Sequence, residues 1–264
     1  MSNLQDNNIK NHIDNNIDNN IDNNIDNNID NNIDNNIDNN IDNKNIITFI
    51  IPTIGRETLI DSVNSIVNQT NKNWKCIIIF DGVKNNYDLC NENITIYEIE
   101  KTKGIINQAS DVRNYGIQKA SSKWIAFLDD DDTIADDYVE IFYNEQQIFD
   151  FDIYIFRMKM DQRIIPNYDC FDFKICDVGI SFICHKKVFD KISFQNSHTE
   201  DFEFLNNARE KKYKIIISNT IKYYVKEIYN KNNKNYMNDL PIHNKIFINC
   251  LNPFLFYHLL QEIA

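Results

Sequence analysis

The sequence predicts an α/β domain built on a mixed, mostly parallel sheet with helices on its faces. From residue 45 onward, apolar runs typical of buried strands alternate with segments of helical periodicity. Polar and acidic residues directly follow three of these runs, and an open parallel sheet binds ligands at the carboxyl ends of its strands. The 264 residues, 42% of them hydrophobic, suffice for one ordinary domain and an appendage.

The first half of the domain follows a strand-and-helix alternation. In its first helix Leu59, Val63 and Ile66 recur at the spacing of one helical face. This alternation is that of βαβ units, which pair their strands in parallel. The predicted elements are a strand at 46–51, a helix at 58–70, strands at 74–81 and 94–100, and a helix at 106–120.

The second half of the domain is less regular in sequence. Its predicted elements are a strand at 123–129, a helix at 135–148, a strand at 151–158, an irregular stretch at 160–198, a helix at 200–211 and a strand at 214–218. The irregular stretch has few interpretable patterns, and we expect it to shape the pocket for a second substrate.

Residues 1–44 form a separate low-complexity segment. From residue 13 to residue 43 an Ile-Asp-Asn-Asn unit repeats, and nine aspartates against two lysines carry −7 of the formal charge of −12. One isoleucine in four residues cannot offset the entropy of ordering the chain, so we predict a disordered, dispensable tail. The alternative is a helical self-association stripe, which a four-residue step disfavours because it drifts around a 3.6-residue helix.

Residues 229–264 are predicted to be a helical extension of the domain at 45–228. The uncharged run at 246–261 is too short and too often interrupted to span a bilayer, so we expect no transmembrane segment. We expect the extension to pack on the domain. A membrane-surface contact or a homodimer contact is the alternative, although no Lys- and Arg-rich polar face supports membrane docking.

Cysteine usage and charge restrict the compartment and the partners. Six cysteines without a CxxC pair, and an amino terminus without a signal peptide, favour free thiols in a reducing compartment. We therefore expect a cytoplasmic protein, soluble or peripherally associated with a membrane. No basic surplus is present to neutralise a phosphate backbone, which argues against nucleic acid as a partner.

Three segments direct polar side chains toward one rim of the predicted sheet. They are Pro52, Thr53 and Arg56 after the first strand, Asp81 at the end of the second, and Asp129, Asp130, Asp131 and Asp132 after the strand at 123–129. Like charges repel in such a run unless they share a cation, and carboxylate oxygens suit Mg²⁺ or Mn²⁺. Such an ion takes further ligands from substrate phosphates, which implies a nucleoside diphosphate. The alternative is that these acids favour the start of the next helix through its dipole.

Other candidate residues have structural alternatives of similar strength. Asp81 can accept the N3–H of a uracil ring, or it can cap its own turn. Arg113 and Asn114 can bridge donor phosphates, whereas the alternative for Arg113 is an ordinary surface position. Glu200 and Asp201 fit the first turn of a helix, and spacing alone gives Asp201 no catalytic role.

In their order along the chain, these motifs resemble the family 2 inverting glycosyltransferases of the GT-A fold. The family opening resembles residues 50–82, with Pro-Thr, a turn with Arg, and a strand that ends in Asp-Gly. The family centre, Gly then Arg-Asn then Leu-Asp-x-Asp-Asp, is similar to residues 103–132, and its Glu-Asp motif is similar to residues 199–217. Two positions depart from the pattern, because Phe80 replaces a common acidic residue and Gly55 a common asparagine.

The resemblance implies an inverting, metal-dependent hexosyl- or N-acetylhexosaminyltransferase of glycan biosynthesis. Its donor is a nucleoside-diphosphate sugar, expected to be a UDP-sugar, and its acceptor hydroxyl belongs to a glycan, glycolipid or glycoprotein. Asp201 is then the base, Glu200 orients the site, and Asp131 with Asp129 holds Mn²⁺ or Mg²⁺. The implied donor-site positions are Pro52, Thr53, Arg56, Asp81, Gly104, Arg113, Asn114, Asp129 and Asp130.

Two other classes of protein fit parts of this pattern. A sugar-nucleotide nucleotidyltransferase shares a related fold and metal chemistry, but its first loop is usually glycine-rich and basic. The corresponding segment here, residues 52–59, contains a single glycine. A catalytically inactive sugar- or nucleotide-binding module is the third class, which the retention of every candidate acid disfavours.

Deletion of residues 1–43 is expected to leave folding and activity unchanged, because the repeat contributes no core-forming pattern. The melting temperature and the turnover of the truncated and full chains test this prediction. A large loss in either quantity would show that the segment packs or participates.

Overall fold

The chain divides into two compact units, residues 1–45 and residues 46–264. The computed structural model describes residues 46–103, 108–170, 172–175 and 177–226, all within the second unit. The tail predicted at 1–44, the extension predicted at 229–264 and the candidate Gly104 therefore lie outside the described residues.

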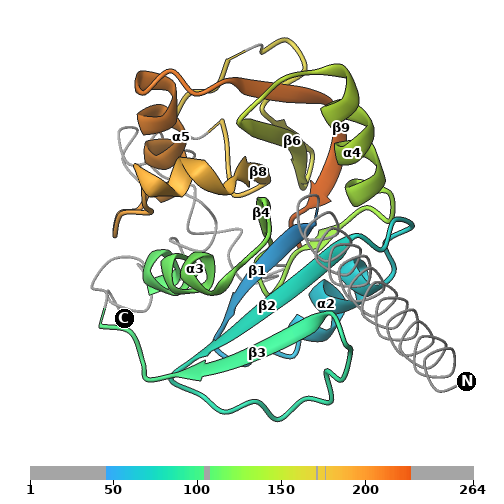
Figure 1. Cartoon of the computed structure of the whole chain (residues 1–264), viewed down its shortest axis with the longest axis vertical. Coiled ribbons are helices and arrows are strands. Elements are labelled where there is room, and N and C mark those ends of the chain that lie inside the picture. The colour runs from blue at the N-terminus through green and yellow to red at the C-terminus, as the bar shows by residue number, and fades with distance from the viewer. Residues whose placement is uncertain (1–45, 104–107, 171, 176, 227–264) are drawn as a thin grey trace, which may run out of the picture. The chain divides into compact units, whose positions relative to one another are not determined.

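Within the described residues, nine strands form one mixed sheet in the order β3-β2-β1-β4-β8-β6-β9-β5, and β7 pairs with β6 (Figure 1). The strands β3, β2, β1 and β4 are parallel, β8 is antiparallel to both of its neighbours, and β6 and β9 are parallel again. The bounds are β1 Ile47–Thr53, β2 Trp74–Asp81, β3 Ile94–Ile99, β4 Trp124–Phe127, β5 Thr133–Ile134, β6 Ile153–Met160, β7 Arg163–Ile165, β8 Phe182–His185 and β9 Ile215–Tyr224.

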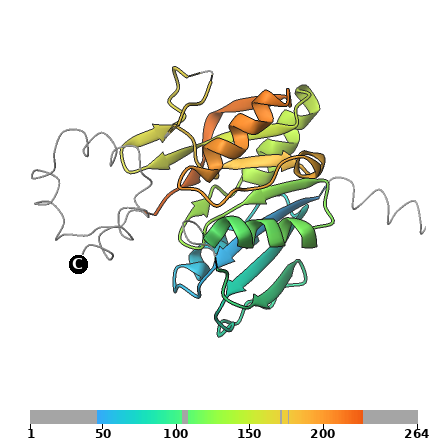
Figure 2. The same ribbon diagram turned by 90° about the vertical axis from the view of Figure 1, so that its left-hand side faces the viewer.

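Helices cover both faces of this sheet. The helices α3 and α5 lie on the face that Figure 2 turns toward the viewer, and α2 and α4 lie on the other face (Figures 1 and 2). Their bounds are α2 Leu59–Val67, α3 Gln108–Lys119, α4 Tyr138–Ile148 and α5 Glu200–Glu210, with a short 3₁₀ helix, η2, at Lys186–Asp190. The predicted α/β fold class is therefore confirmed.

A glycine sets how closely α3 approaches the sheet. A Cβ atom on Gly116 would lie 2.7 Å from Cγ2 of Ile50 on β1 and 2.9 Å from Cδ1 of Ile79 on β2. Any larger side chain would therefore push α3 off the sheet. Because α3 also carries Arg113, this close packing fixes the height of the guanidinium above the strand ends.

A stack of aromatic rings seats α5 against the sheet. Phe204 of α5 stacks on Phe182 of β8 with centroids 5.5 Å apart, and on Phe194 with centroids 4.7 Å apart. Phe127 of β4 meets the Phe194 ring edge-on at 5.1 Å. Such ring pairs add stabilisation beyond their buried area, so the start of α5 is held close to the end of β4.

The largest difference from the sequence-based expectation lies in the stretch 160–198. It was expected to be irregular, but it contains β7, β8 and η2, and β8 joins the two parallel parts of the sheet. The four residues of β8 are too few for periodicity to separate a strand from a loop. The last strand was also predicted too short, because the polar residues Ser218, Asn219 and Thr220 interrupt the apolar pattern of β9.

The described residues also bear on the expectations about thiols and membranes. Across the described ranges, no helix is both long enough and apolar enough to cross a bilayer. The four cysteines whose state is described, Cys76, Cys90, Cys170 and Cys184, are free.

Substitution of Gly116 by valine should destabilise the fold by about 1–3 kcal/mol, because overpacking forces strain into a filled core. Urea denaturation of the variant measures this loss. Valine at the exposed position 118 of the same helix is the control, since it adds the same side chain without a core contact. Equal stability of the two variants would contradict the close approach of α3.

Candidate active site

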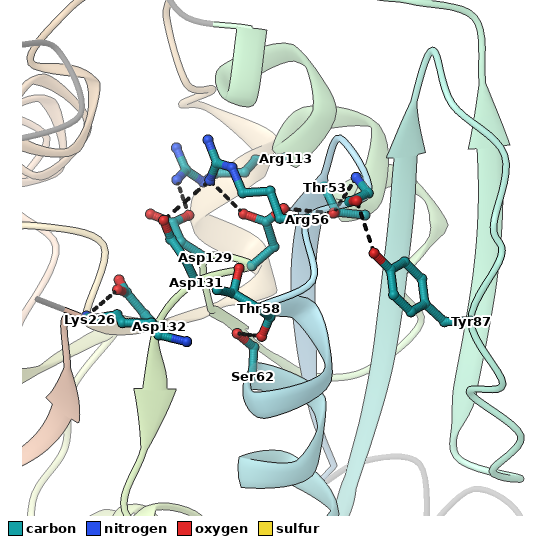
Figure 3. Close-up of polar contacts among 12 residues, drawn as sticks. Thr53, Arg56, Thr58, Ser62, Tyr87, Arg113, Asp129, Asp131, Asp132 and Lys226 are labelled. Carbon is teal, nitrogen blue, oxygen red and sulfur yellow. Dashed lines mark hydrogen bonds and ion pairs between the residues drawn. The ribbon is translucent and has the colours of Figure 1, made fainter. Parts of the chain in front are cut away.

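The first polar cluster joins the loops that follow β1 and β4. Thr53 donates its hydroxyl hydrogen to Oδ2 of Asp130 at 2.6 Å. Nη1 of Arg56 lies 2.8 Å from Oδ1 of Asp130 and 3.3 Å from Oδ2 of Asp131. Four predicted site residues, from segments more than 70 positions apart, thus meet at one rim of the sheet (Figure 3).

Negative charge in this cluster is only partly compensated. Burial raises the pKa of Asp131 to about 7, the Asp129 charge adds to the rise, and the Arg56 charge opposes it. Burial likewise raises the pKa of Asp130, against the opposing charge of Arg56 and the Thr53 hydrogen bond. The Oδ1 atom of Asp131 is buried and has no hydrogen-bond partner among the described residues. A buried anionic oxygen without a partner is a suitable ligand for a cation.

Among the residues that the structure describes, no group of three or more His, Cys, Asp or Glu side chains is arranged to hold a metal ion. This arrangement does not suit an ion held by the protein alone. It does suit Mg²⁺ or Mn²⁺ held by one or two carboxylates and by the phosphates of a substrate. Asp131, with its buried unpaired oxygen, and the quarter-exposed Asp129 are the side chains that fit such an ion.

The second polar cluster is centred on Arg113 of α3. Its Nη2 lies 2.6 Å from Oδ1 of Asp129, and its Nη1 lies 3.0 Å from Oε1 of Glu200 (Figure 3 shows the first pair). The side chain is 4% exposed. Burial lowers its pKa, but the charges of Asp129, Asp201 and Glu200 outweigh burial and raise the pKa above its usual range. Arg113 therefore stays charged and connects the end of β4 to the start of α5.

Asp201 lies beside this bridge, in the first turn of α5. Burial and the neighbouring charge of Glu200 raise its pKa well above the usual range, Arg113 opposes the rise, and Asp129 adds to it. Its Oδ1 atom is buried and lacks a partner in the described part of the chain. The unpaired Oδ1 atom can accept a hydrogen bond from a molecule that reaches it. Thr199 is the N-cap residue of α5 and makes no side-chain bond to the backbone, and both acids lie in the first turn, where the helix dipole also favours them.

A third cluster surrounds Asp81 at the end of β2, where the side chain is 3% exposed. Its Oδ1 accepts the backbone N–H of Thr102 at 2.7 Å. Its Oδ2 accepts the Thr102 hydroxyl at 2.9 Å and the Lys101 ammonium at 3.1 Å. These contacts hold the carboxylate at the rim, and among the described residues Oδ1 accepts from one donor.

Several predicted donor residues have an internal role. Asn114 uses its side-chain amide to bond the backbone N–H and C=O of Phe194, so it anchors the loop before α5. Thr53 is 3% exposed, and its hydroxyl both bonds Asp130 and accepts the N–H of Gly55. Both Asp130 oxygens accept from Thr53 or Arg56. Asn114 and Asp130 thus have internal partners in the structure, and their assignment to the donor site stays a prediction. Pro52, in β1, is half-buried and has no side-chain donor.

Sequence reasoning missed four residues of the site region. The Tyr223 hydroxyl of β9 accepts the backbone N–H of Asp129 at 3.2 Å and also bonds Asp132. The backbone N–H of Lys226 donates to Oδ1 of Asp132 at 3.1 Å (Figure 3). Lys101 and Thr102 complete the Asp81 cluster. Only the position of Lys101 and Thr102, directly after a predicted strand, could have drawn attention to them.

This combination, a mixed sheet with acidic residues at its central strand end and helices on both faces, defines a GT-A fold. Solved structures of TarS from Staphylococcus aureus support this conclusion. One aligns with a TM-score of 0.58 at 16% identity, over 69% of this chain and 37% of that chain. A second, in complex with UDP-GlcNAc, gives 0.58 at 16% identity, over 69% and 58% of the two chains.

Residues 48–168 match the family model described as glycosyl transferase family 2. An uncharacterized glycosyltransferase of Rickettsia bellii is 35% identical over 101 residues, which cover 36% of this chain and 14% of that protein. Glycosyltransferase GlyA of Streptococcus pneumoniae is 28% identical over 183 residues, 65% of this chain and 23% of GlyA. The chain thus spans only a small part of these relatives. The predicted resemblance to the family 2 glycosyltransferases is confirmed.

Replacement of Arg113 by methionine should destabilise the protein by about 3 kcal/mol, because Asp129 and Glu200 would keep buried charge without a partner. Chemical denaturation at neutral pH measures the change. Methionine at Arg209, whose ion pair with Asp172 is largely exposed, is the matched control, with an expected loss below about 1 kcal/mol. Similar losses of unfolding free energy in the two variants would show that the ion pairs of Arg113 contribute no more to stability than an exposed pair does.

Proposed function

We propose that this protein transfers a sugar from a UDP-sugar to an acceptor hydroxyl with inversion at the anomeric carbon. The observation that carries this proposal is the Arg113 bridge, which brings the acidic end of β4 and the acidic start of α5 to one guanidinium. A glycosyltransferase needs its leaving-group site and its general base this close, because both act on the same carbon.

The donor half of the site is assigned to the loops after β1, β2 and β4. Arg56 and Asp131 lie at the rim, and Oδ1 of Asp81, which accepts one N–H among the described residues, is proposed to accept a ring N–H as well. TarS, which shares the fold, has been solved with UDP and with UDP-GlcNAc. A similar protein from Escherichia coli, 23% identical over 60% of this chain and 67% of its own length, is named a UDP-glucose β-1,3-glucosyltransferase. These names favour a hexosyl or N-acetylhexosaminyl group on UDP.

Mn²⁺ or Mg²⁺ is the proposed cofactor, held by Asp131 with Asp129 and the donor phosphates. When bound, such an ion supplies positive charge to the diphosphate as it departs. Arg113 keeps the Asp129 carboxylate in place, and Arg56 braces the loop that carries Asp131. The side chains of this rim are thereby positioned before the donor arrives, which is the condition for electrostatic stabilisation.

Asp201 is proposed as the general base. It removes the proton of the acceptor hydroxyl while that oxygen attacks the anomeric carbon, and the bond from this carbon to the diphosphate oxygen breaks. Attack from the face opposite the leaving group inverts the centre, and a single carboxylate is sufficient as base. Oε1 of Glu200 accepts a hydrogen bond from Nη1 of Arg113 at 3.0 Å, and this contact orients the first turn of α5.

The acceptor is proposed to be a hydroxyl of a glycan, glycolipid or glycoprotein. Residues 160–198, with β7 and β8, lie between the strand β6 and the helix that carries Asp201. They are therefore the proposed source of acceptor contacts.

One assay distinguishes glycosyl transfer from the two alternative functions, nucleotidyl transfer and binding without catalysis. Purified protein is incubated with UDP-sugar, with and without Mn²⁺, and the release of UDP is followed. Release of UDP that requires the cation supports glycosyl transfer. Formation of UTP and a sugar 1-phosphate when pyrophosphate is added would support the nucleotidyltransferase, and binding without release would support the module.

The variants Asp131→Asn and Asp201→Asn should separate the two acidic sites. Asp131→Asn is expected to weaken UDP binding in the presence of Mn²⁺, because it removes a charged ligand from the shared cation. Asp201→Asn is expected to leave that binding intact and to slow transfer by about 10²–10⁴-fold. Calorimetry with UDP and Mn²⁺, together with turnover, measures both effects.

Circular dichroism of both variants serves as the folding control. Transfer by Asp201→Asn at the original rate would overturn the base assignment. Unchanged UDP affinity in Asp131→Asn at limiting Mn²⁺ would overturn the metal assignment.

A further inference from the structure

Tyr223 of β9 is a buried residue whose hydroxyl contacts both ends of the acidic turn at 129–132. The hydroxyl accepts the backbone N–H of Asp129 at 3.2 Å and is hydrogen-bonded to the side chain of Asp132. Within the turn, the backbone N–H of Asp132 donates to the carbonyl of Asp129 at 3.2 Å. One hydroxyl group therefore holds the first and the last residue of the turn that carries the proposed metal ligands.

The backbone on both sides of Tyr223 keeps this hydroxyl in place. Tyr223 pairs with Ile134 of β5 and with Met158 of β6, and it is 0% exposed. Its partner Asp132 is also buried, and Oδ1 of Asp132 accepts the backbone N–H of Lys226 at 3.1 Å (Figure 3). The segment 223–226 thus fixes the last residue of the turn through two hydrogen bonds.

The aspartates of this turn have different roles. Asp132 bonds Tyr223 and Lys226, so it braces the turn. Asp131 instead has a buried oxygen, Oδ1, without a partner among the described residues. With so few protein oxygens available, the position of a bound ion depends on the shape of this one turn. Groups that orient the ligands of a metal commonly affect its affinity nearly as much as the ligands do.

We propose that Tyr223 sets the cation preference of the site by holding the turn 129–132 in one shape. A fixed turn keeps the carboxylates of Asp129 and Asp131 at a constant separation, which suits the strict octahedral geometry of Mg²⁺. Ca²⁺ accepts more ligands in more variable arrangements, so it depends less on a fixed turn. Tyr223 acts through the turn and is a positioning residue. This inference rests on the proposed function of the site.

Calorimetric titration of the full chain with UDP, at limiting Mg²⁺, at limiting Ca²⁺ and in EDTA, tests the inference. Tyr223→Phe removes the hydroxyl and keeps the ring. With Mg²⁺, its affinity for UDP is expected to fall by about 10–100-fold, the usual scale for loss of a group that orients a metal ligand. With Ca²⁺ the fall should be smaller, so the ratio of the two affinities decreases. In EDTA the affinity should stay unchanged.

Tyr138→Phe is the matched control. Tyr138 of α4 is also 0% exposed, and its hydroxyl has no hydrogen-bond partner in the described part of the chain. Its ring packs against Phe49 and Phe156, so the variant removes the same buried atom without a bond to the turn. The ratio of the Mg²⁺ and Ca²⁺ affinities should therefore stay unchanged. Thermal melting shows whether each variant is folded. If Tyr223→Phe is not, Asp132→Ala removes the other partner of the same hydrogen bond and is expected to lower the ratio.

The outcomes separate this inference from the proposed function. An unchanged ratio in the folded variant, or an equal loss of UDP affinity with Mg²⁺, with Ca²⁺ and in EDTA, would overturn the role of Tyr223 and leave the glycosyltransferase proposal standing. Equal UDP affinities of the unmodified protein with Mg²⁺ and Ca²⁺ would do the same. A fall of the ratio in Tyr138→Phe as large as that in Tyr223→Phe would reduce the effect to loss of any buried hydroxyl and overturn the inference. Failure of the unmodified protein to bind UDP under every condition would overturn the proposed function, and this inference with it.

Discussion

The buried guanidinium of Arg113 is the interaction on which the arrangement of the site depends. A charge that is 4% exposed is tolerated only with close partners, and Arg113 has one on each side, Asp129 at 2.6 Å and Glu200 at 3.0 Å. These acids come from the end of β4 and the start of α5, which are 71 positions apart in sequence. Moving any one of the three elements leaves a buried charge without its partner. Electrostatics therefore couples the position of the acids after β4 to that of α5, which carries the proposed base.

Apolar packing determines where this guanidinium lies. Gly116 lets α3 approach Ile50 and Ile79 to a distance that no other residue would permit, and Arg113 stands one turn earlier on the same helix. On the opposite side, the rings of Phe194 and Phe204 hold α5, and Phe194 also packs against Arg113 at 5.8 Å. The polar bridge is short because two independent apolar contacts bring its ends together.

The rim formed by the loops after β1, β2 and β4 could be predicted from the sequence because these strands are parallel neighbours in the sheet. Thr53, Asp81 and Asp131 each follow a continuous apolar run, and parallel neighbours place those ends together. The contacts within the rim could not be predicted. The bond from Asn114 to Phe194 depends on the path of residues 190–199. The internal bonds to both oxygens of Asp130 depend on the side-chain rotamers of Thr53 and Arg56. The strand β8 was missed because its order in the sheet is set by tertiary pairing and not by periodicity.

The two halves of the site are therefore held by different forces. Main-chain pairing of β1, β2 and β4 fixes Asp81 and the acids after β4, so the donor rim is as rigid as the parallel sheet itself. Asp201 depends instead on aromatic packing around Phe204 and on one ion pair through its neighbour Glu200. A change of ring size in that packing would displace Asp201, the proposed base, and leave the loops after β1, β2 and β4 in place. Loss of transfer with retained donor binding is thus the expected signature of damage to the packing of α5, because precise placement matters most for the group that moves the proton.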